Sequence, residues 1–271
     1  MRNVLNRHQR LQSEKARINM IQTVNLTRHY GTLAAVQDLN VEVEEGELFG
    51  FLGPNGAGKT TTIRMIVGLL RPTAGTARVA GHDVQQEPLA VKRSVGYLAQ
   101  TPLLYEKLTG REFLRFIGGL YSLNDDVIEA RTEQLLALMD LSDRADHLIE
   151  SYSGGMCHKI GLCGALLHEP PVLLLDEPLT GMDPYGARRI KDLLREMCRQ
   201  GKTVFLSTHV LEVAERVCDR VAILDQGQLI AVGTMETLRA QAQSTAETTL
   251  EDLFLTLTGG GTTAEMVSML G

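Results

Sequence analysis

The chain has 271 residues, a formal net charge of −6 and 44% hydrophobic residues. This balance predicts a packed globular protein and disfavours one that tracks nucleic acid through a basic surface. The four cysteines lack the spacing of a zinc site or disulfide framework, which indicates a reducing cytoplasmic setting, and no run of about 18 apolar residues is long enough to span a bilayer.

The N-terminal segment, residues 1–19, is basic and lacks the apolar centre of a signal peptide. We expect a disordered extension there, with Met20 as an alternative start of the chain. Two runs that follow, Ile21–Leu26 and Leu39–Val43, alternate apolar and polar residues. This pattern predicts two antiparallel strands with one solvent-exposed face, and hence a small β-layer ahead of the next motif.

Residues 49–62 contain the pattern Gly-x-x-x-x-Gly-Lys-Thr between an apolar run and a helical pattern, residues 60–70. This is a P-loop in the setting that its chemistry needs. Its glycines let backbone N–H groups face phosphate oxygens, Lys59 supplies a mobile charge, and Thr60 offers a hydroxyl to Mg²⁺. The nucleotide-binding residues predicted from this motif are Gly53, Pro54, Asn55, Gly56, Ala57, Gly58, Lys59, Thr60 and Thr61.

The remaining pattern predicts an α/β fold. Uniformly apolar runs at 48–52, 172–175, 204–206 and 221–224 are typical of strands buried on both sides of a parallel sheet. Helical patterns fill residues 111–120, 127–141, 154–167 and 186–199, and residues 225–228 resemble a hairpin turn. We therefore expect a P-loop NTPase core with a mainly parallel sheet, an N-terminal antiparallel β-layer and an inserted helical subdomain at about residues 101–167.

The predicted domain spans residues 20–235, followed by a helical tail at 236–271.

An apolar strand ends in Asp176 and Glu177. In a P-loop protein the first carboxylate at such a strand end holds the Mg²⁺ shell, usually through water, and the second polarises the attacking water. A P-loop with this acid pair still fits many NTPases.

Ser153-Gly154-Gly155 narrows the choice, since it lies just before a helical pattern and 23 positions ahead of Asp176 (176 minus 153). With these residues the chain resembles the nucleotide-binding subunit of an ATP-binding cassette transporter, from about Ile21 to Gly233. The resemblance implies that this signature reaches the γ-phosphate of ATP held by a second subunit. Two subunits would then enclose two ATP molecules.

The same resemblance assigns further residues one at a time. Tyr30 matches the aromatic that stacks on adenine, Gln100 matches the glutamine that contacts Mg²⁺ and water, and His209 matches the switch histidine near the γ-phosphate. The loop at 180–183 matches the segment that crosses the dimer interface. The implied catalytic residues are Glu177 and His209, and the implied Mg²⁺ ligands are Thr60, Gln100 and Asp176.

Two departures and the tail refine the assignment. Tyr152 and Met156 flank the signature where Leu and Gln are commoner, and the tail run 250–258 is similar to the closing helix of type 2 exporter ATPases. The implied partners are a paired cassette, identical or not, and a membrane permease contacted through residues 103–108, at the inner face of the cell membrane. A soluble cassette ATPase in cluster assembly or another non-transport role is the alternative, while a P-loop kinase or GTPase fits the signature and His209 less well.

Overall fold

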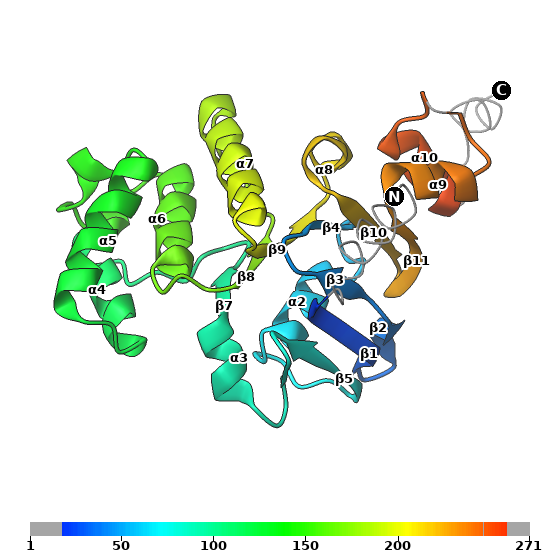
Figure 1. The fold of residues 1–271 in the computed structure, drawn as a ribbon, viewed down its shortest axis with the longest axis horizontal. Helices are drawn as coiled ribbons and strands as arrows, with labels where there is room; N and C mark the ends of the chain where they lie inside the picture. Colours follow the sequence, from blue (N-terminus) through cyan, green and yellow to red (C-terminus); the bar gives the residue numbers. More distant parts are fainter. Residues whose placement is uncertain (1–17, 246, 259–271) are drawn as a thin grey trace, which may run out of the picture.

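The computed structural model describes residues 18–245 and 247–258, which form two sheets and a helical insert (Figure 1). The larger sheet has six strands in the order β11-β10-β4-β9-β8-β7. All neighbours are parallel except β10 and β11. Its strands are β4 (Leu48–Leu52), β7 (Val95–Leu98), β8 (Val172–Asp176), β9 (Thr203–Thr208), β10 (Arg220–Asp225) and β11 (Gln228–Gly233).

The apolar runs predicted as parallel strands lie in the middle of this sheet. All residues of β4, β8 and β9 are buried, because helices or the second sheet cover both faces. The ring of Phe205 on β9 lies 5.6 Å from that of Phe49 and 5.0 Å from that of Phe51 on β4. The predicted α/β class is confirmed.

The smaller sheet is antiparallel, as predicted, but its strands differ from the predicted ones. The expected single strand at 39–43 is wrong, because the chain breaks there and the two pieces pair with different halves of β1. Asn40 causes the break: its side-chain amide bonds Asn25 across the sheet and the carbonyl of Asp38, replacing ladder bonds. The strands are β1 (Asn19–Tyr30), β2 (Leu33–Leu39), β3 (Glu42–Glu44), β5 (Ala74–Val79) and β6 (His82–Asp83).

This β-layer does not simply precede the P-loop, since β5 and β6 follow it in the chain. Asn19, placed in the N-terminal extension by sequence, pairs with Glu44 at the start of β1. The rest of that extension, except Ile18, lies outside the described residues, as do residue 246 and residues 259–271 of the predicted tail.

The helix after the P-loop, α2 (Lys59–Ile66), packs in one apolar cluster with residues of both sheets. It is shorter than the predicted 60–70. Gly68 takes a left-handed φ of 72°, and its N–H bonds the carbonyl of Met65, so the helix ends there rather than at Pro72.

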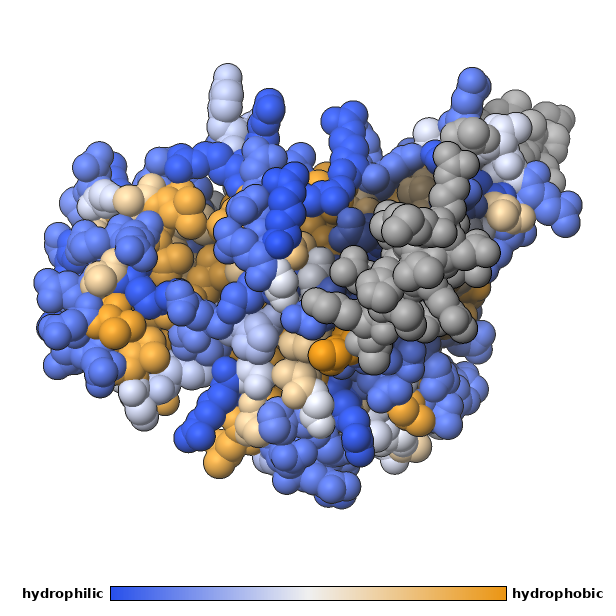
Figure 2. Space-filling model, in the orientation of Figure 1, coloured by the Kyte–Doolittle hydropathy of each residue, from blue (hydrophilic) through white to orange (hydrophobic). Residues whose placement is uncertain are grey.

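The helical insert lies at one end of the molecule, on the left of Figure 1. Thr109 is the N-cap of its first helix, and the side chains of Thr109 and Glu112 form a reciprocal capping box. On the face seen in Figure 2, which is mainly hydrophilic, apolar patches are broad over this insert. It comprises α4 (Gly110–Leu120), α5 (Asp125–Leu138) and α6 (Gly154–Leu166), with short 3₁₀ turns at Ser142–Arg144 and Ile149–Ser151.

The other helices cover the larger sheet or its edge. The predicted hairpin at 225–228 is confirmed, with Asp225 opposite Gln228. The tail helix α10 packs with α8 and β10 in a third apolar cluster. Among the described residues, none of the helices combines the length and apolarity needed to cross a membrane. These helices are α3 (Pro88–Ser94), α7 (Pro184–Arg199), α8 (Leu211–Val217), α9 (Met235–Gln241) and α10 (Leu250–Thr258).

Candidate active site

Three central strands bring the predicted catalytic motifs together. Strands β4, β9 and β8 are adjacent and parallel, with Leu52 opposite Thr208 and Asp176 opposite Ser207. Their carboxyl ends therefore meet at one edge of the sheet, where ligands bind in open α/β folds. The P-loop leaves β4 at this edge, Glu177 follows β8, and His209 follows β9.

The P-loop backbone is held so tightly that two of its glycines have no room for a side chain. A Cβ on Gly53 would lie 2.3 Å from the carbonyl oxygen of Leu224, and one on Gly58 would lie 2.4 Å from that of Ala35. Gly58 also has a left-handed φ of 105° directly before α2. The loop thus opens the N-terminus of a helix toward the site, which suits an anion.

The Lys59 side chain is buried and folds back over the loop. Its Nζ donates to the carbonyls of Gly53 at 2.7 Å and Pro54 at 3.1 Å, and lies 3.7 Å from Oε1 of Glu177. Burial lowers the pKa of Lys59, while the charges of Glu177 and Asp176 oppose that shift. The ammonium therefore lies beside Glu177.

Glu177 lies between two basic side chains. Its Oε1 is 2.9 Å from Nδ1 of His209 and 3.7 Å from Nζ of Lys59, and this oxygen has no hydrogen-bond partner among the described residues. Glu177 is buried, whereas the His209 side chain is 48% exposed. A buried carboxylate oxygen without a hydrogen bond remains free to accept one from a bound water.

Ser207 was not predicted as a site residue, although it connects both acids. This buried serine on β9 donates its hydroxyl to Oδ1 of Asp176 at 2.5 Å and accepts the N–H of Glu177 at 3.1 Å. The other carboxylate oxygen, Oδ2 of Asp176, is buried without a hydrogen-bond partner among the described residues. A serine that directly follows an apolar run carries no signal of this contact, which depends on the pairing of β8 with β9.

Two residues assigned by resemblance come from other strands, Tyr30 from the smaller sheet and Gln100 from the loop after β7. The Tyr30 side chain, at the end of β1, is 46% exposed, and the guanidinium of Arg28 lies 4.7 Å from its ring centroid. Gln100 is exposed and follows β7, the neighbour of β8. Its backbone carbonyl accepts a hydrogen bond from Nε2 of His158 at 2.9 Å, a contact that the sequence did not reveal.

The signature lies on the helical insert. Ser153 is the N-cap of α6, and its Oγ accepts the N–H of Met156 at 3.3 Å. Gly155 lies against the 180–183 loop, because a Cβ there would be 3.3 Å from the carbonyl oxygen of Gly181. The contacts of this turn are therefore with the expected interface loop, and those of Lys59 are with the P-loop and Glu177.

Comparison with known proteins identifies the family. A family model described as ABC transporter matches residues 36–180. The daunorubicin resistance ATP-binding protein DrrA3 of Streptomyces coeruleorubidus is 42% identical over 214 residues, 79% of this chain and 68% of the relative. The linearmycin resistance ATP-binding protein LnrL of Bacillus subtilis is 39% identical over 215 residues, 79% of this chain and 69% of the relative.

Two solved structures extend the comparison to the fold. The ATP-binding subunit of an ABC transporter superposes with a TM-score of 0.83 at 34% identity, covering 88% of this chain and 99% of that one. A dimeric ATP-binding cassette in a post-hydrolysis state, bound to ADP and phosphate, gives a TM-score of 0.75 at 25% identity, covering 80% and 99%. The chain therefore belongs to the ABC transporter family, as an ATP-binding, ATP-hydrolysing subunit of the branch that includes these resistance proteins.

Proposed function

We propose that this chain powers a drug exporter, closing on a paired cassette when ATP binds and reopening when ATP is hydrolysed. The observation that carries the catalytic part is the position of Glu177 Oε1 between Lys59 and His209. The export part is supported by the names of the relatives, which are resistance proteins for daunorubicin and linearmycin.

In this mechanism the P-loop amides and Lys59 bind the phosphates of ATP. Lys59 exchanges its bonds to the Gly53 and Pro54 carbonyls for phosphate oxygens, and Glu177 orients or deprotonates the attacking water. His209, 2.9 Å from Glu177, steadies the γ-phosphate. These side chains are preorganised in a partly buried site, where charge stabilisation is stronger than in water.

The site also fits a hydrated Mg²⁺ ion. Oδ2 of Asp176 is buried without a hydrogen-bond partner among the described residues, and Thr60 offers a hydroxyl in the first turn of α2. Hydroxyl, amide and carboxylate oxygens suit this ion, so Thr60 and Gln100 would hold it directly and Asp176 through water. When bound it would neutralise phosphate charge.

We further propose that the cassettes pair head to tail, as two identical or two related chains. Ser153, Gly154 and Gly155 of one cassette would then face the P-loop of the other. The dimeric state of the related post-hydrolysis cassette supports this arrangement. The loop at 180–183, which lies against Gly155, would cross the interface.

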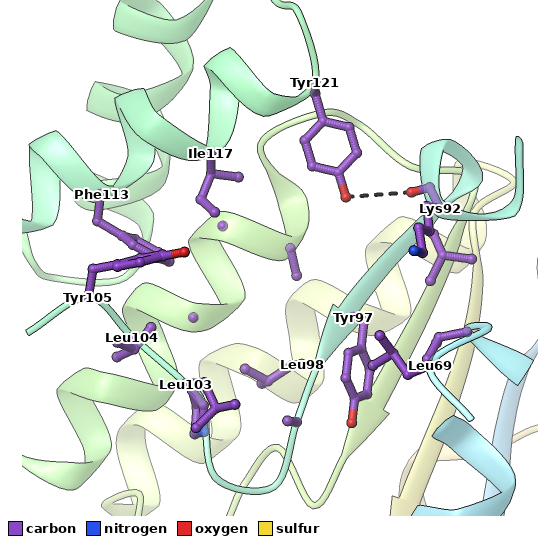
Figure 3. Close-up of a pocket in the computed structure, with 17 residues that line it drawn as sticks. Leu69, Lys92, Tyr97, Leu98, Leu103, Leu104, Tyr105, Phe113, Ile117 and Tyr121 are labelled. Carbon is purple, nitrogen blue, oxygen red and sulfur yellow. Dashed lines mark hydrogen bonds between the residues drawn. The ribbon is translucent and has the colours of Figure 1, made fainter. Parts of the chain in front are cut away.

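A membrane permease would dock beside residues 103–108. An apolar cavity of about 390 Å³ lies between α4, α6 and the segment after β7 (Figure 3), lined by Leu69, Tyr97, Leu98, Leu103, Tyr105 and Ile117 among others. Leu103 is 93% exposed and Tyr105 is 55% exposed at this cavity, so the two side chains and the apolar lining form a contiguous apolar patch of the kind that marks interaction sites. The protein would therefore be peripheral on the inner face of the cell membrane.

Glu177→Gln tests the catalytic proposal. We expect ATP binding to persist and turnover to be abolished, because the amide cannot take a proton from water. Glu47→Gln is the matched control: it neutralises another buried carboxylate, paired with Arg220 just before β4, and should retain turnover. Normal turnover by Glu177→Gln would show that Glu177 does not activate the attacking water.

Affinity purification from gently solubilised membranes tests the transport proposal. A multi-span partner in stoichiometric amount supports the exporter, and its sequence would narrow the cargo. Recovery of soluble partners alone would favour the soluble cassette ATPase, for instance in cluster assembly.

A further inference from the structure

Arg28 and Tyr30 share one face of β1. They are two residues apart in a strand, so their side chains emerge on the same side of the sheet. The Arg28 guanidinium lies 4.7 Å from the Tyr30 ring centroid, within the range of a cation–π contact. One side of this half-exposed ring is thereby engaged by a side chain from its own strand.

Arg28 is itself anchored to the segment that follows α2. Its Nη1 donates to the carbonyl of Arg71 at 2.9 Å. The adjoining backbone is fixed to the same segment, because the N–H of His29 donates to Oγ1 of Thr73 at 3.0 Å and the N–H of Thr73 donates to the carbonyl of Thr27 at 2.8 Å. The position of the ring is thus linked to the segment between α2 and β5, which follows the P-loop helix.

We propose that Arg28 is a positioning residue for the adenine base: it holds the Tyr30 ring so that the opposite face is ready to stack on ATP. The inference rests on the proposed function, in which Tyr30 stacks on adenine. An exposed tyrosine without this contact would sample several rotamers, and binding would have to immobilise it. Fixing the ring in advance lowers that entropic cost and so lowers the KM for ATP.

The contact should depend on the planar group of arginine as well as on its charge. Guanidinium can stack flat on the ring while it donates sideways to the Arg71 carbonyl, whereas a lysine ammonium is a compact point charge. Arg28→Lys therefore keeps the charge but should lose the positioning. Arg71→Ala is the matched control, since it removes an exposed arginine side chain and leaves the carbonyl that anchors Arg28.

The test is steady-state ATP hydrolysis by wild type, Arg28→Ala, Arg28→Lys, Arg71→Ala, Tyr30→Ala and the double variant Arg28→Ala/Tyr30→Ala. We expect Arg28→Ala to raise KM about two- to fivefold with kcat nearly unchanged. Arg28→Lys should raise KM in the same direction, and Arg71→Ala should match wild type. The double variant should have the KM of Tyr30→Ala alone, because Arg28 acts through the ring.

The outcomes distinguish failure of the positioning role of Arg28 from failure of adenine stacking by Tyr30. An unchanged KM in Tyr30→Ala would refute adenine stacking. A raised KM in Tyr30→Ala with an unchanged KM in Arg28→Ala would overturn the positioning role, and a lowered KM there would mean that Arg28 covers the face that the base needs. Thermal melting checks the fold, and if Arg28→Ala is unfolded, the KM of Arg28→Lys decides.

Discussion

Ser207→Ala removes the hydroxyl that connects the two acids of the site. The substitution deletes the bond to Oδ1 of Asp176 at 2.5 Å and the one accepted from the N–H of Glu177 at 3.1 Å, both in the buried sheet. Oδ2 of Asp176 already has no hydrogen-bond partner, so the substitution would leave neither carboxylate oxygen with a hydrogen bond from the described residues. Glu177 would keep one backbone bond, to the carbonyl of Ser207 at 3.2 Å.

The expected loss of stability follows from these contacts. A hydrogen bond to a charged group contributes about 1.5–3 kcal/mol, and the shared amide bond adds about 0.5–1 kcal/mol. We therefore expect Ser207→Ala to lower the free energy of unfolding by about 2–4 kcal/mol. Because the chain has no tryptophan, urea unfolding followed by far-UV circular dichroism is the suitable assay.

Thr203→Val provides a matched control on the same strand. The Thr203 hydroxyl donates to the carbonyl of Glu44 at 3.2 Å and accepts the N–H of Gly46 at 3.1 Å, at the end of β9 away from the acids. Because Thr203→Val loses two neutral hydrogen bonds, we expect it to lower the free energy of unfolding by about 1–2 kcal/mol and to leave kcat unchanged.

Ser207→Ala should also reduce kcat by about 10- to 100-fold, since a small displacement of a catalytic group is costly. Equal stability losses in the two variants, together with normal kcat in Ser207→Ala, would refute the reasoning.

Two further predictions concern His168 and Leu103. Burial lowers the pKa of His168, which stacks on Tyr121 with ring centroids 3.7 Å apart, to about 4. Protonation is then disfavoured in the folded state, so its stabilising contribution is complete above pH 6.5 and is lost as the pH falls toward 4. After discounting for partial exposure we expect about 1–2 kcal/mol, seen as a steeper loss of unfolding free energy in wild type than in His168→Asn; equal slopes would contradict this. Leu103→Asp should reduce co-purification of the membrane partner at least tenfold, whereas Leu89→Asp, an exposed leucine on α3, should not. Equal recovery of the partner by the two variants, with normal melting curves, would show that the partner does not dock at Leu103.

The parts that sequence predicted best are those specified by neighbouring residues. The P-loop and the acid pair are contiguous motifs, and the buried strands are uniformly apolar runs, so both could be located from the order of residues alone. The break between β2 and β3 was missed because it depends on Asn40 meeting Asn25 across the sheet. Ser207, Arg28 and His158 were missed for the same reason, since each acts through a residue on another element or a later turn.

The backbone at Glu177 shows why the acid pair works as a pair. Successive side chains in a strand point to opposite faces, so a simple extension of β8 would send Asp176 and Glu177 in opposite directions. Glu177 instead has a left-handed φ of 52°, which costs a residue with a Cβ about 1–2 kcal/mol. This conformation redirects the chain so that Asp176 reaches Ser207 while Glu177 reaches His209 and Lys59. The two bonds from the Glu177 N–H to Ser207 offset the strain, which makes Ser207 as important to the geometry of the site as the acids themselves.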